Sequence, residues 1–525
     1  MSMGAGLRAP RRHGTLFGLG GGQLVAVEIA AALVLATVGA APWLLAAAPV
    51  ALVILVAALG RFREHWIYEW LTLGTRYLGR RRVLAPGADA RALLALVRPD
   101  AIVTSIDADG ARTGVIEDAY GLTAVLELGD PAALLGEAAP LAPPPAELLH
   151  PPNADQPRVR LQLLLSALPA PGPHTGPGSP STSYRQLTEG RVPASQRAFL
   201  AVQVRRVGGF GEADLRRALS SAVRRVCRRF AHDGLPCRAL NPEAALRALG
   251  ELAHLGGADG LREEWAAVGT GGLRQVSLLL RRWPDVGGDP GRSLLAHVLA
   301  LPGAATAVSL AVERPDADEV RVELVVRLAS PGPQSQAVAL AALRRLLRAS
   351  GTRARRLDGT QLAGLAATLP LGGAVDPATG FLADLLDRSA GAAVADGVGL
   401  RTSPQLLAGL ELPPCGDGLA MGVNRHGEPT PVRLFRSEPT RVALFGLRYA
   451  QLLALRALAL GARVVVWTGR PQAWEAFARG VSGSGDALAV LPTNRALELG
   501  PASPLLPQLV IVDAGGTDSV GAAVR

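Results

Sequence analysis

The sequence predicts a membrane protein with a two-helix transmembrane hairpin and an α/β (α+β) cytoplasmic region. Within that region we expect a ferredoxin-like βαββαβ part and a small C-terminal α/β sheet. Three observations lead to this fold class. Two apolar runs of about 18 residues lie within residues 24–60, where Glu28 is the only charged residue. Strand and helix patterns follow one another in the order β-α-β-β-α-β over residues 275–358. A further β-α-β pattern begins near residue 441.

The apolar stretch Leu24–Gly60 is expected to form the hairpin, with its turn at Pro42. At roughly 1.5 Å per residue, each run covers roughly 27 Å, close to the roughly 30 Å hydrocarbon thickness of a bilayer. The alternatives are a buried helix of a soluble protein and, for the first run, a cleaved signal peptide. Soluble helices usually carry polar residues every third or fourth position, and a second apolar run follows at once, so we favour the hairpin.

Arginines flank the hairpin on both sides, whereas the connection between the runs carries no charge. By the positive-inside rule, both ends are cytoplasmic. The sequence therefore predicts a two-span, multi-pass protein of the plasma (inner) membrane. Residues 1–23 are expected to be a flexible, basic, cytoplasmic tail, and the large C-terminal region is expected to lie on the same side.

Residues 61–82 are expected to form an aromatic and arginine-rich helix at the membrane interface. Aromatic residues recur there every three or four positions, which places them on one helical face. Aromatic rings suit the headgroup level, and arginines beside them can meet anionic lipid. The alternative is that this stripe packs against the protein's own soluble part. The residues predicted to contact the membrane or a partner are Trp66, Tyr68, Trp70, Tyr77, Arg80, Arg81 and Arg82.

The rest of the chain is expected to divide into several parts by composition and pattern. They are a first cytoplasmic α/β part (83–168), a Pro/Gly/Ser-rich loop (169–183), the ferredoxin-like α+β domain (184–358), a linker with short helices (359–418) and the C-terminal α/β part (419–525). In the last part, strands are predicted at Arg441–Phe445, Arg463–Thr468 and Leu509–Val512.

Composition excludes several kinds of chemistry. All 54 basic residues are arginine, so a P-loop lysine, a Schiff-base lysine and a protein-kinase lysine are all excluded. Cys227, His232 and Cys237 have no familiar metal-ligand spacing, and with Cys415 the cysteines are expected to be reduced thiols. We predict no metal site.

Residues 212–232 are expected to form an amphipathic helix with a basic outer face. Such a face can bind nucleic acid or lipid phosphates, but a solvated charged face is the more common structure, and no nucleic-acid partner is predicted. The arginines of this face are Arg216, Arg217, Arg224, Arg225, Arg228 and Arg229.

The C-terminal β-α-β pattern resembles a Rossmann half. The turn after Phe445 reads G-L-R-Y-A, which lacks the glycines of a G-x-G-x-x-G phosphate loop. Asp513 ends the last strand, where α/β sheets often place ligand-binding residues; it can equally cap a turn. Neither H-E-x-x-H nor G-x-S-x-G occurs. We therefore predict no catalytic residue, no cofactor and no enzyme activity. The alternative is a membrane-bound enzyme that uses a Rossmann-like cleft on a nucleotide- or lipid-linked substrate.

A series of motifs follows the apolar stretch. They are SYRQL at Ser183–Leu187, RRWP at Arg281–Pro284, RLDGTQ at Arg356–Gln361, TLPLGG at Thr368–Gly373 and FRSEPTRVALFG at Phe435–Gly446. Because these motifs occur in this order after the apolar stretch, the chain resembles EccE, a membrane component of actinobacterial type VII (ESX) secretion systems. The chain is rich in Ala, Gly, Pro and Arg, and this composition is typical of proteins from the high-GC genomes of actinobacteria.

The resemblance implies a structural, membrane-anchored subunit that supports assembly or stability of the inner-membrane machine. It also implies that the partners are the EccB, EccC and EccD components and the lipid bilayer, and that EccC is the ATPase.

Overall fold

The computed structural model describes residues 21–36, 41–62, 65–373 and 399–513. Short gaps interrupt these ranges at 109, 131–132, 135–140, 154, 174, 176–178, 189–191, 208, 257–259, 415–417, 424, 426–428, 437–438, 482–486, 498, 500–501 and 504. The chain forms two compact units. The first comprises residues 1–81, 358–360 and 376–397, and the second comprises residues 82–357, 361–375 and 398–525.

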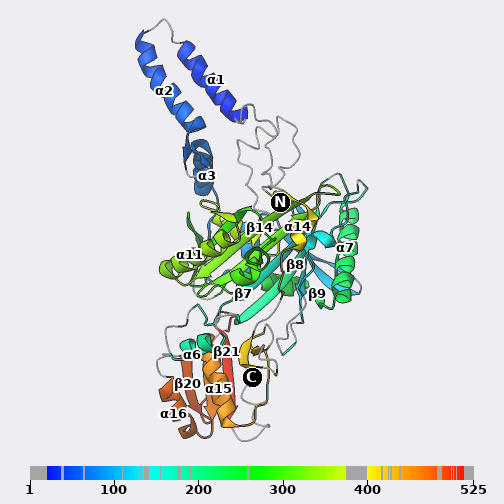
Figure 1. Ribbon diagram of the computed structural model, residues 1–525, viewed down its shortest axis with the longest axis vertical. Coiled ribbons are helices and arrows are strands. Elements are labelled where there is room, and N and C mark those ends of the chain that lie inside the picture. The colour runs from blue at the N-terminus through cyan, green and yellow to red at the C-terminus, as the bar shows by residue number, and fades with distance from the viewer. Residues whose placement is uncertain are drawn as a thin grey trace. The chain divides into compact units, whose positions relative to one another are not determined.

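The first unit begins with two helices, α1 (Gly21–Leu35) and α2 (Ala41–Leu59), which pack side by side (Figure 1). A short antiparallel pair follows, formed by β1 (Arg61–Phe62) and β2 (His65–Trp66). Helix α3 (Ile67–Gly79) comes next and contacts α2. The helix predicted from residue 61 therefore starts only at Ile67, and Trp66 lies on β2.

The predicted transmembrane hairpin is wrong, and with it the predicted two-span location in the plasma membrane. In the part of the chain that the structure describes, no helix is both long enough and apolar enough to cross a membrane. The first apolar run continues past the end of α1, which has 15 residues and so covers roughly 22 Å. Helix α2 contains Pro49, which removes a helical hydrogen bond. For the first run, the prediction failed because it took the length of the apolar run for the length of a helix.

The second unit is dominated by a 14-stranded sheet. Its main path runs β3-β10-β11-β12-β14-β13-β7-β8-β6-β5-β4, with β15 beside β12, β16 beside β14 and β9 beside β6. Neighbouring strands pair antiparallel, as in β7 with β8 and β13 with β14. The strands are β3 (Val83–Leu84), β4 (Ile102–Ala108), β5 (Ala111–Asp118), β6 (Gly121–Leu128), β7 (Val159–Leu168), β8 (Ser195–Arg205), β9 (Cys237–Ala239), β10 (Leu261–Glu263), β11 (Val268–Thr270), β12 (Leu273–Arg282), β13 (Ala305–Glu313), β14 (Val320–Ser330), β15 (Arg353–Arg356) and β16 (Leu400–Thr402).

This sheet overturns the predicted fold class. Strands β12, β13, β14 and β15 follow one another, with helices only before β13 and before β15, and they lie in the order β15-β12-β14-β13. However, β13 also pairs with β7, so these strands continue into β8, β6, β5 and β4 of the preceding region. A hairpin with a small α/β region and a ferredoxin-like part is therefore wrong. Hydrophobic periodicity identifies strands, but it does not say which distant strands pair.

Most of the helices that precede the C-terminal region cover the two faces of the sheet, but the one formed by Ser179–Thr188 contacts the C-terminal region instead. The helices are α4 (Ala90–Val97), α5 (Pro145–Leu148), α6 (Ser179–Thr188), α7 (Glu212–His232), α8 (Pro242–Leu252), α9 (Asp289–Arg292), α10 (Leu294–Leu299), α11 (Pro333–Ala349), α12 (Gln361–Ala367) and α14 (Pro404–Ala408). Helix α11 packs near β14, and α7 packs near β8, β6 and β4, so the two helices lie on the same face of the sheet, with β13 and β7 running between their positions (Figure 1).

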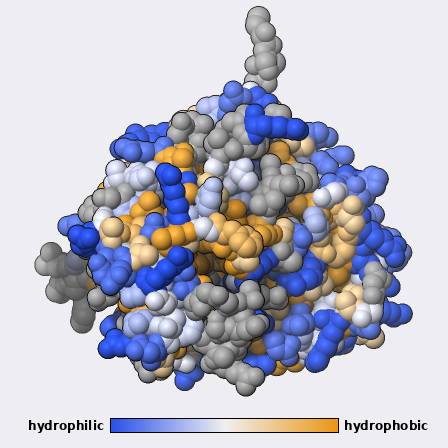
Figure 2. All heavy atoms as spheres, turned by 90° about the horizontal axis from the view of Figure 1, so that it is seen from below, coloured by the Kyte–Doolittle hydropathy of each residue, from blue (hydrophilic) through white to orange (hydrophobic). Residues whose placement is uncertain are grey.

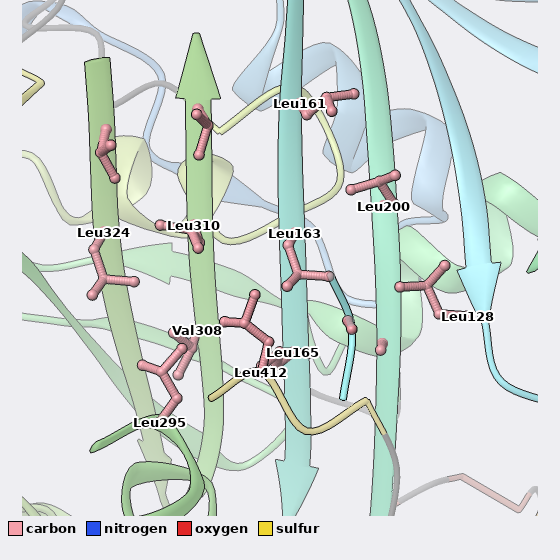
Figure 3. Close-up of a cluster of buried hydrophobic side chains, with 14 of the residues drawn as sticks. Leu128, Leu161, Leu163, Leu165, Leu200, Leu295, Val308, Leu310, Leu324 and Leu412 are labelled. Carbon is pink, nitrogen blue, oxygen red and sulfur yellow. The ribbon is translucent and has the colours of Figure 1, made fainter. Parts of the chain in front are cut away.

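One face of the sheet, which we call the apolar face, carries leucine and valine side chains. Alternate residues of β7, namely Leu161, Leu163 and Leu165, point to this face, as the period of two in a strand requires. They pack with Leu200, Val308, Leu310 and Leu324 of neighbouring strands and with Leu295 of α10 (Figure 3). Helix α7 adds Leu215, Leu219, Val223, Val226 and Phe230, which recur at helical spacing.

The opposite face combines an apolar cluster with a belt of polar side chains. Helices α4 and α8 cover the apolar cluster, which includes Leu164 and Phe199. The belt includes Gln162, Gln203 and Ser309, which are all buried. Residues 361–373, which we call the strap, comprise α12 and the chain after it and lie against this belt.

The C-terminal region holds the antiparallel pair β17 (Leu419–Val423) and β18 (Pro429–Val432) and a three-stranded parallel sheet in the order β20-β19-β21. Its elements are α15 (Leu447–Ala459), β19 (Arg463–Thr468), α16 (Gln472–Gly480), β20 (Leu488–Pro492) and β21 (Gln508–Asp513). The predicted strand Arg441–Phe445 does not form, and Phe445 is 91% exposed. Hydrophobic residues reach the surface elsewhere as well. In the view of Figure 2, a band of them crosses the surface of the molecule between hydrophilic residues.

Candidate functional site

The candidate site is a surface cavity of about 410 Å³, which we call the arginine-rimmed cavity. It lies between the loop that follows α5, the start of β7 and one side of α7. Its lining residues are Leu148, Leu149, His150, Pro151, Pro152, Asn153, Gln156, Pro157, Arg158, Val159, Leu161, Val207, Phe210, Ala222, Arg225, Val226 and Arg314.

Local structure explains why these residues meet. Ala222, Arg225 and Val226 are three and four positions apart on α7, so they share one helical face. Arg314 follows β13 and fixes the loop, because its Nη1 donates to the carbonyl oxygen of Leu149 at 3.2 Å. The Nε of Arg314 donates to the carbonyl oxygen of Ala317 at 3.2 Å. The Arg314 side chain therefore holds the loop in place as part of the cavity wall.

The electrostatics of the cavity are one-sided. Among the described residues, its lining holds three arginines and neither aspartate nor glutamate. The side chains of Arg158 and Arg225 are exposed, and within the described residues they form no ion pair or hydrogen bond. Several other arginines of α7 are paired, since Arg229 Nε lies 2.9 Å from Asp233 Oδ2 and Arg216 pairs with Glu117. The cavity therefore presents two uncompensated positive charges beside an apolar floor.

Sequence reasoning predicted only part of this site. Arg225 belonged to the basic face predicted for residues 212–232, but that face included paired arginines as well. Arg158 and the loop before it were missed. Their signal is weak, because it consists of an arginine at the start of a strand after the prolines at 151, 152 and 157. Only the fold brings that loop against α7.

The residues predicted to contact the membrane or a partner lie on and around α3. Trp70 and Tyr77 are seven positions apart on this helix and are half-buried. Arg80 donates from Nη2 to the carbonyl oxygen of Gly359 at 2.8 Å, so this guanidinium binds within its own unit. Arg81 is exposed and Arg82 is half-buried.

The side chains of Trp66 and Tyr68 lie outside the described part of the structure. A role for the α3 residues in contacting a membrane or a partner therefore stays a prediction.

Asp513, the best-placed carboxylate of the predicted Rossmann-like part, lies at the carboxyl end of β21 and is fully engaged. Arg470 donates to it from Nη2 at 2.8 Å and from Nε at 3.0 Å. The Thr468 hydroxyl donates to Oδ2 at 2.9 Å, and Trp474 Nε1 donates to the same oxygen at 3.2 Å. The hydrogen bond from Arg470 lowers the pKa of Asp513 below its usual value, despite partial burial. A carboxylate with this many donors is a poor general base.

The cysteines of the predicted C-x4-H-x4-C stretch lie close together without a metal-binding arrangement. The Sγ atoms of Cys227 and Cys237 are 3.6 Å apart. The hydrogen bond with Cys227, followed by burial, raises the pKa of the Cys237 thiol, which disfavours a reactive thiolate. Within the described residues, no group of three or more His, Cys, Asp or Glu side chains is placed to hold a metal ion. Cys415 lies outside them.

Comparisons with known proteins add little to this geometry. No family model matches the chain, and no curated protein matches it. Among solved structures, it is similar to the crystal structure of an unknown protein from Galdieria sulphuraria, at 15% sequence identity and a TM-score of 0.13. The match covers 39% of this chain and 99% of that chain. A likeness at this TM-score carries no argument about fold or function, so function must be argued from the residues.

Proposed function

We propose that this protein is a structural subunit of a type VII (ESX) secretion complex, which acts through contacts and not through catalysis. Its proposed partners are the EccB, EccC and EccD components. The resemblance of its ordered motifs to EccE is the basis of the proposal. The observation that carries the non-catalytic role is that described residues of four of these motifs, namely SYRQL, RRWP, RLDGTQ and TLPLGG, are engaged in building the fold.

The RLDGTQ and TLPLGG motifs illustrate this use, because they begin and end the strap. The Gln361 side chain accepts a hydrogen bond from the backbone N–H of Ser277 at 2.8 Å. At the other end, the Gln162 side chain accepts from the N–H of Gly372 at 2.9 Å. Arg160 donates to the carbonyl oxygen of Gly373 at 3.2 Å. These groups are buried and bonded, which suits a structural role.

The SYRQL motif serves the C-terminal region in the same way. The hydroxyl of Tyr184 on α6 accepts from the N–H of Ala420 at 2.9 Å and donates to the carbonyl oxygen of Gly418 at 3.4 Å. Burial raises the pKa of Tyr184, so the neutral hydroxyl that makes both bonds is favoured. The RRWP motif contributes Trp283 to the apolar core.

A direct test is to identify what travels with the protein. We expect the tagged full chain, purified from mild-detergent extracts of the native organism, to bring EccB, EccC and EccD with it. Changing Trp66 and Trp70 together to Ala should lower their recovery if the α3 region is a contact surface. Leu78→Ala is the matched control, because Leu78 lies on the same helix and is 73% exposed. Purification without any of these components would contradict the proposal.

A second experiment separates assembly from catalysis. Asp513→Asn should leave export intact as long as the protein still folds and assembles, because the carboxylate serves Arg470 and its neighbours. Removing a catalytic acid or base commonly slows a reaction by about 10²–10⁴-fold, which a crude export assay detects. A folded, assembled Asp513→Asn protein that abolished export would favour the enzymatic alternative.

A further inference from the structure

We propose that the arginine-rimmed cavity binds a small amphipathic anion, namely a molecule with one apolar chain and one carboxylate or phosphate group. This inference goes beyond the proposed function and does not depend on it. It is carried by an apolar floor, two uncompensated arginines and a loop that is poor in backbone donors, all of which meet at one cavity.

The floor suits an apolar chain. Val159 of β7 and Phe210 of the segment between β8 and α7 line the cavity with partly exposed apolar surface, beside the buried side chains of Leu161 and Val226. A volume of about 410 Å³ lies within the range of small-molecule sites, which are mostly apolar with a few polar groups that fix orientation. Burial of an apolar chain there removes hydrocarbon surface from water on both sides.

The rim suits an anionic head group. Arg158 extends from the start of β7 and Arg225 from α7, and both line the same cavity. Guanidinium groups pair with carboxylate and phosphate oxygens through charge-assisted hydrogen bonds. Since the described residues of the lining include no aspartate or glutamate, none of these residues competes with a ligand for the two arginines.

The loop favours a small molecule over a peptide. Pro151, Pro152 and Pro157 line the cavity, and proline has no backbone N–H to donate. The carbonyl oxygen of Leu149 is already occupied by Arg314. An extended peptide needs main-chain partners along its length, whereas an apolar chain with a single anionic group needs only the floor and the arginines.

The test is a fluorescence titration of the full chain with dansylaminoundecanoate, followed by competition. Decanoate and decyl phosphate should both displace the probe, and decanol, which has the same chain without the charge, should displace it at least tenfold more weakly. The better of the two anions identifies the head group. An acidic peptide amide with leucine side chains that displaced the probe better than either anion would overturn the small-molecule assignment.

Variants locate the binding. Arg158→Ala combined with Arg225→Ala should weaken binding of the probe about tenfold or more, because two charge-assisted contacts are lost. The matched control is Arg228→Ala, since Arg228 is an exposed arginine of α7 that does not line the cavity. Phe210→Ala should weaken binding because it removes contacts with the apolar chain of the ligand, and it should leave the preference for anions unchanged. Unchanged affinity in the double variant, or an equal loss in Arg228→Ala, would overturn the proposal.

Discussion

The two faces of the 14-stranded sheet are built on different physical principles. On the apolar face, Leu161 and Leu163 pack under α7 and α10 by contacts that have no preferred direction. On the opposite face, Gln162 lies between these two leucines in the sequence and directs hydrogen bonds at defined atoms. Its Nε2 donates to Ser309 Oγ at 2.8 Å and to the carbonyl oxygens of Ala367 and Leu369 at 3.0 and 2.9 Å.

The polar belt extends across several strands. Gln203 donates to Thr123 Oγ1 at 3.1 Å and to the carbonyl oxygen of Leu371 at 3.4 Å. Arg205 pairs with Glu313 at 2.9 Å at the same side of the sheet. Hydrogen bonds depend on distance and angle, whereas apolar packing tolerates rearrangement. The comparison teaches that the apolar face supplies general stability, while the belt fixes where the strap lies.

The strongest test compares two neighbouring residues on opposite faces. Gln162→Leu conserves shape and adds apolar surface, yet it leaves the carbonyl oxygen of Ala367 and the N–H of Gly372 without this partner, whereas the Leu369 carbonyl oxygen keeps its bond from the Leu371 N–H at 2.7 Å. We expect it to lower the free energy of unfolding by about 2–6 kcal/mol, since each of the two buried unsatisfied groups costs roughly 1–3 kcal/mol. Urea unfolding of the full chain, followed by circular dichroism, measures the change.

The matched control is Leu163→Met, which conserves volume on the apolar face and should cost less than about 1.5 kcal/mol. If Gln162→Leu proved neutral or stabilising, stability would depend no more on defined partners in the belt than it does on the apolar face. The contrast drawn between the two faces would then be wrong.

A smaller effect is expected where the strap touches the belt. Gly372 has a φ of +92°, and a Cβ there would lie 2.6 Å from the Gln203 side chain. Gly372→Ala should cost about 2–4 kcal/mol, of which about 1–3 kcal/mol is backbone strain and the rest is the disturbed Gln203. Gly303 also has a positive φ, of +72°, but open space around it. Gly303→Ala should therefore lose only the stability that backbone strain costs. Equal losses of stability in the two variants would argue against close contact between the strap and Gln203.

The sequence predicts the two faces unequally. The amphipathic pattern of residues 212–232 identified helix α7, whose Leu215, Leu219 and Val226 pack on the apolar face. Gln162 and Gln203 gave no comparable signal, because a polar residue inside a strand usually faces water, and here the face is covered by a strap far along the chain. Pairing of β7 with β13 was likewise invisible, since strand pairing at long range depends on the whole fold.

The errors have physical causes too. The hairpin was inferred from hydropathy alone, which cannot say where a helix ends. The arginine-rimmed cavity depends on α7 meeting a loop more than sixty residues earlier, so only the isolated basic face of α7 was foreseeable. Asp513 was correctly singled out as the carboxylate at the end of the last strand, but its donors, including Arg470 and Trp474, were not predicted.

The smallest effect concerns a third, more solvent-exposed polar arrangement, in which Asp513 accepts from Arg470, Thr468 and Trp474. The pKa of Asp513 is lowered from its usual 3.8, chiefly by the Arg470 hydrogen bond. The native state therefore binds this proton more weakly than the unfolded chain does, and the carboxylate stabilises the fold above about pH 4. This contribution is lost as the pH falls through the lowered native pKa.

Asp513→Asn should reduce stability at pH 7, and the difference in stability from the wild type should shrink on acidification. Because the Arg470 side chain is 60% exposed, added salt should also shrink it. Asp155→Asn, at an exposed carboxylate, is the control. Urea midpoints of the three proteins at pH 7 and pH 3 check the expectation, and a difference between Asp513→Asn and wild type that persisted or grew at pH 3 would show that Asp513 does not stabilise the C-terminal sheet through its charge.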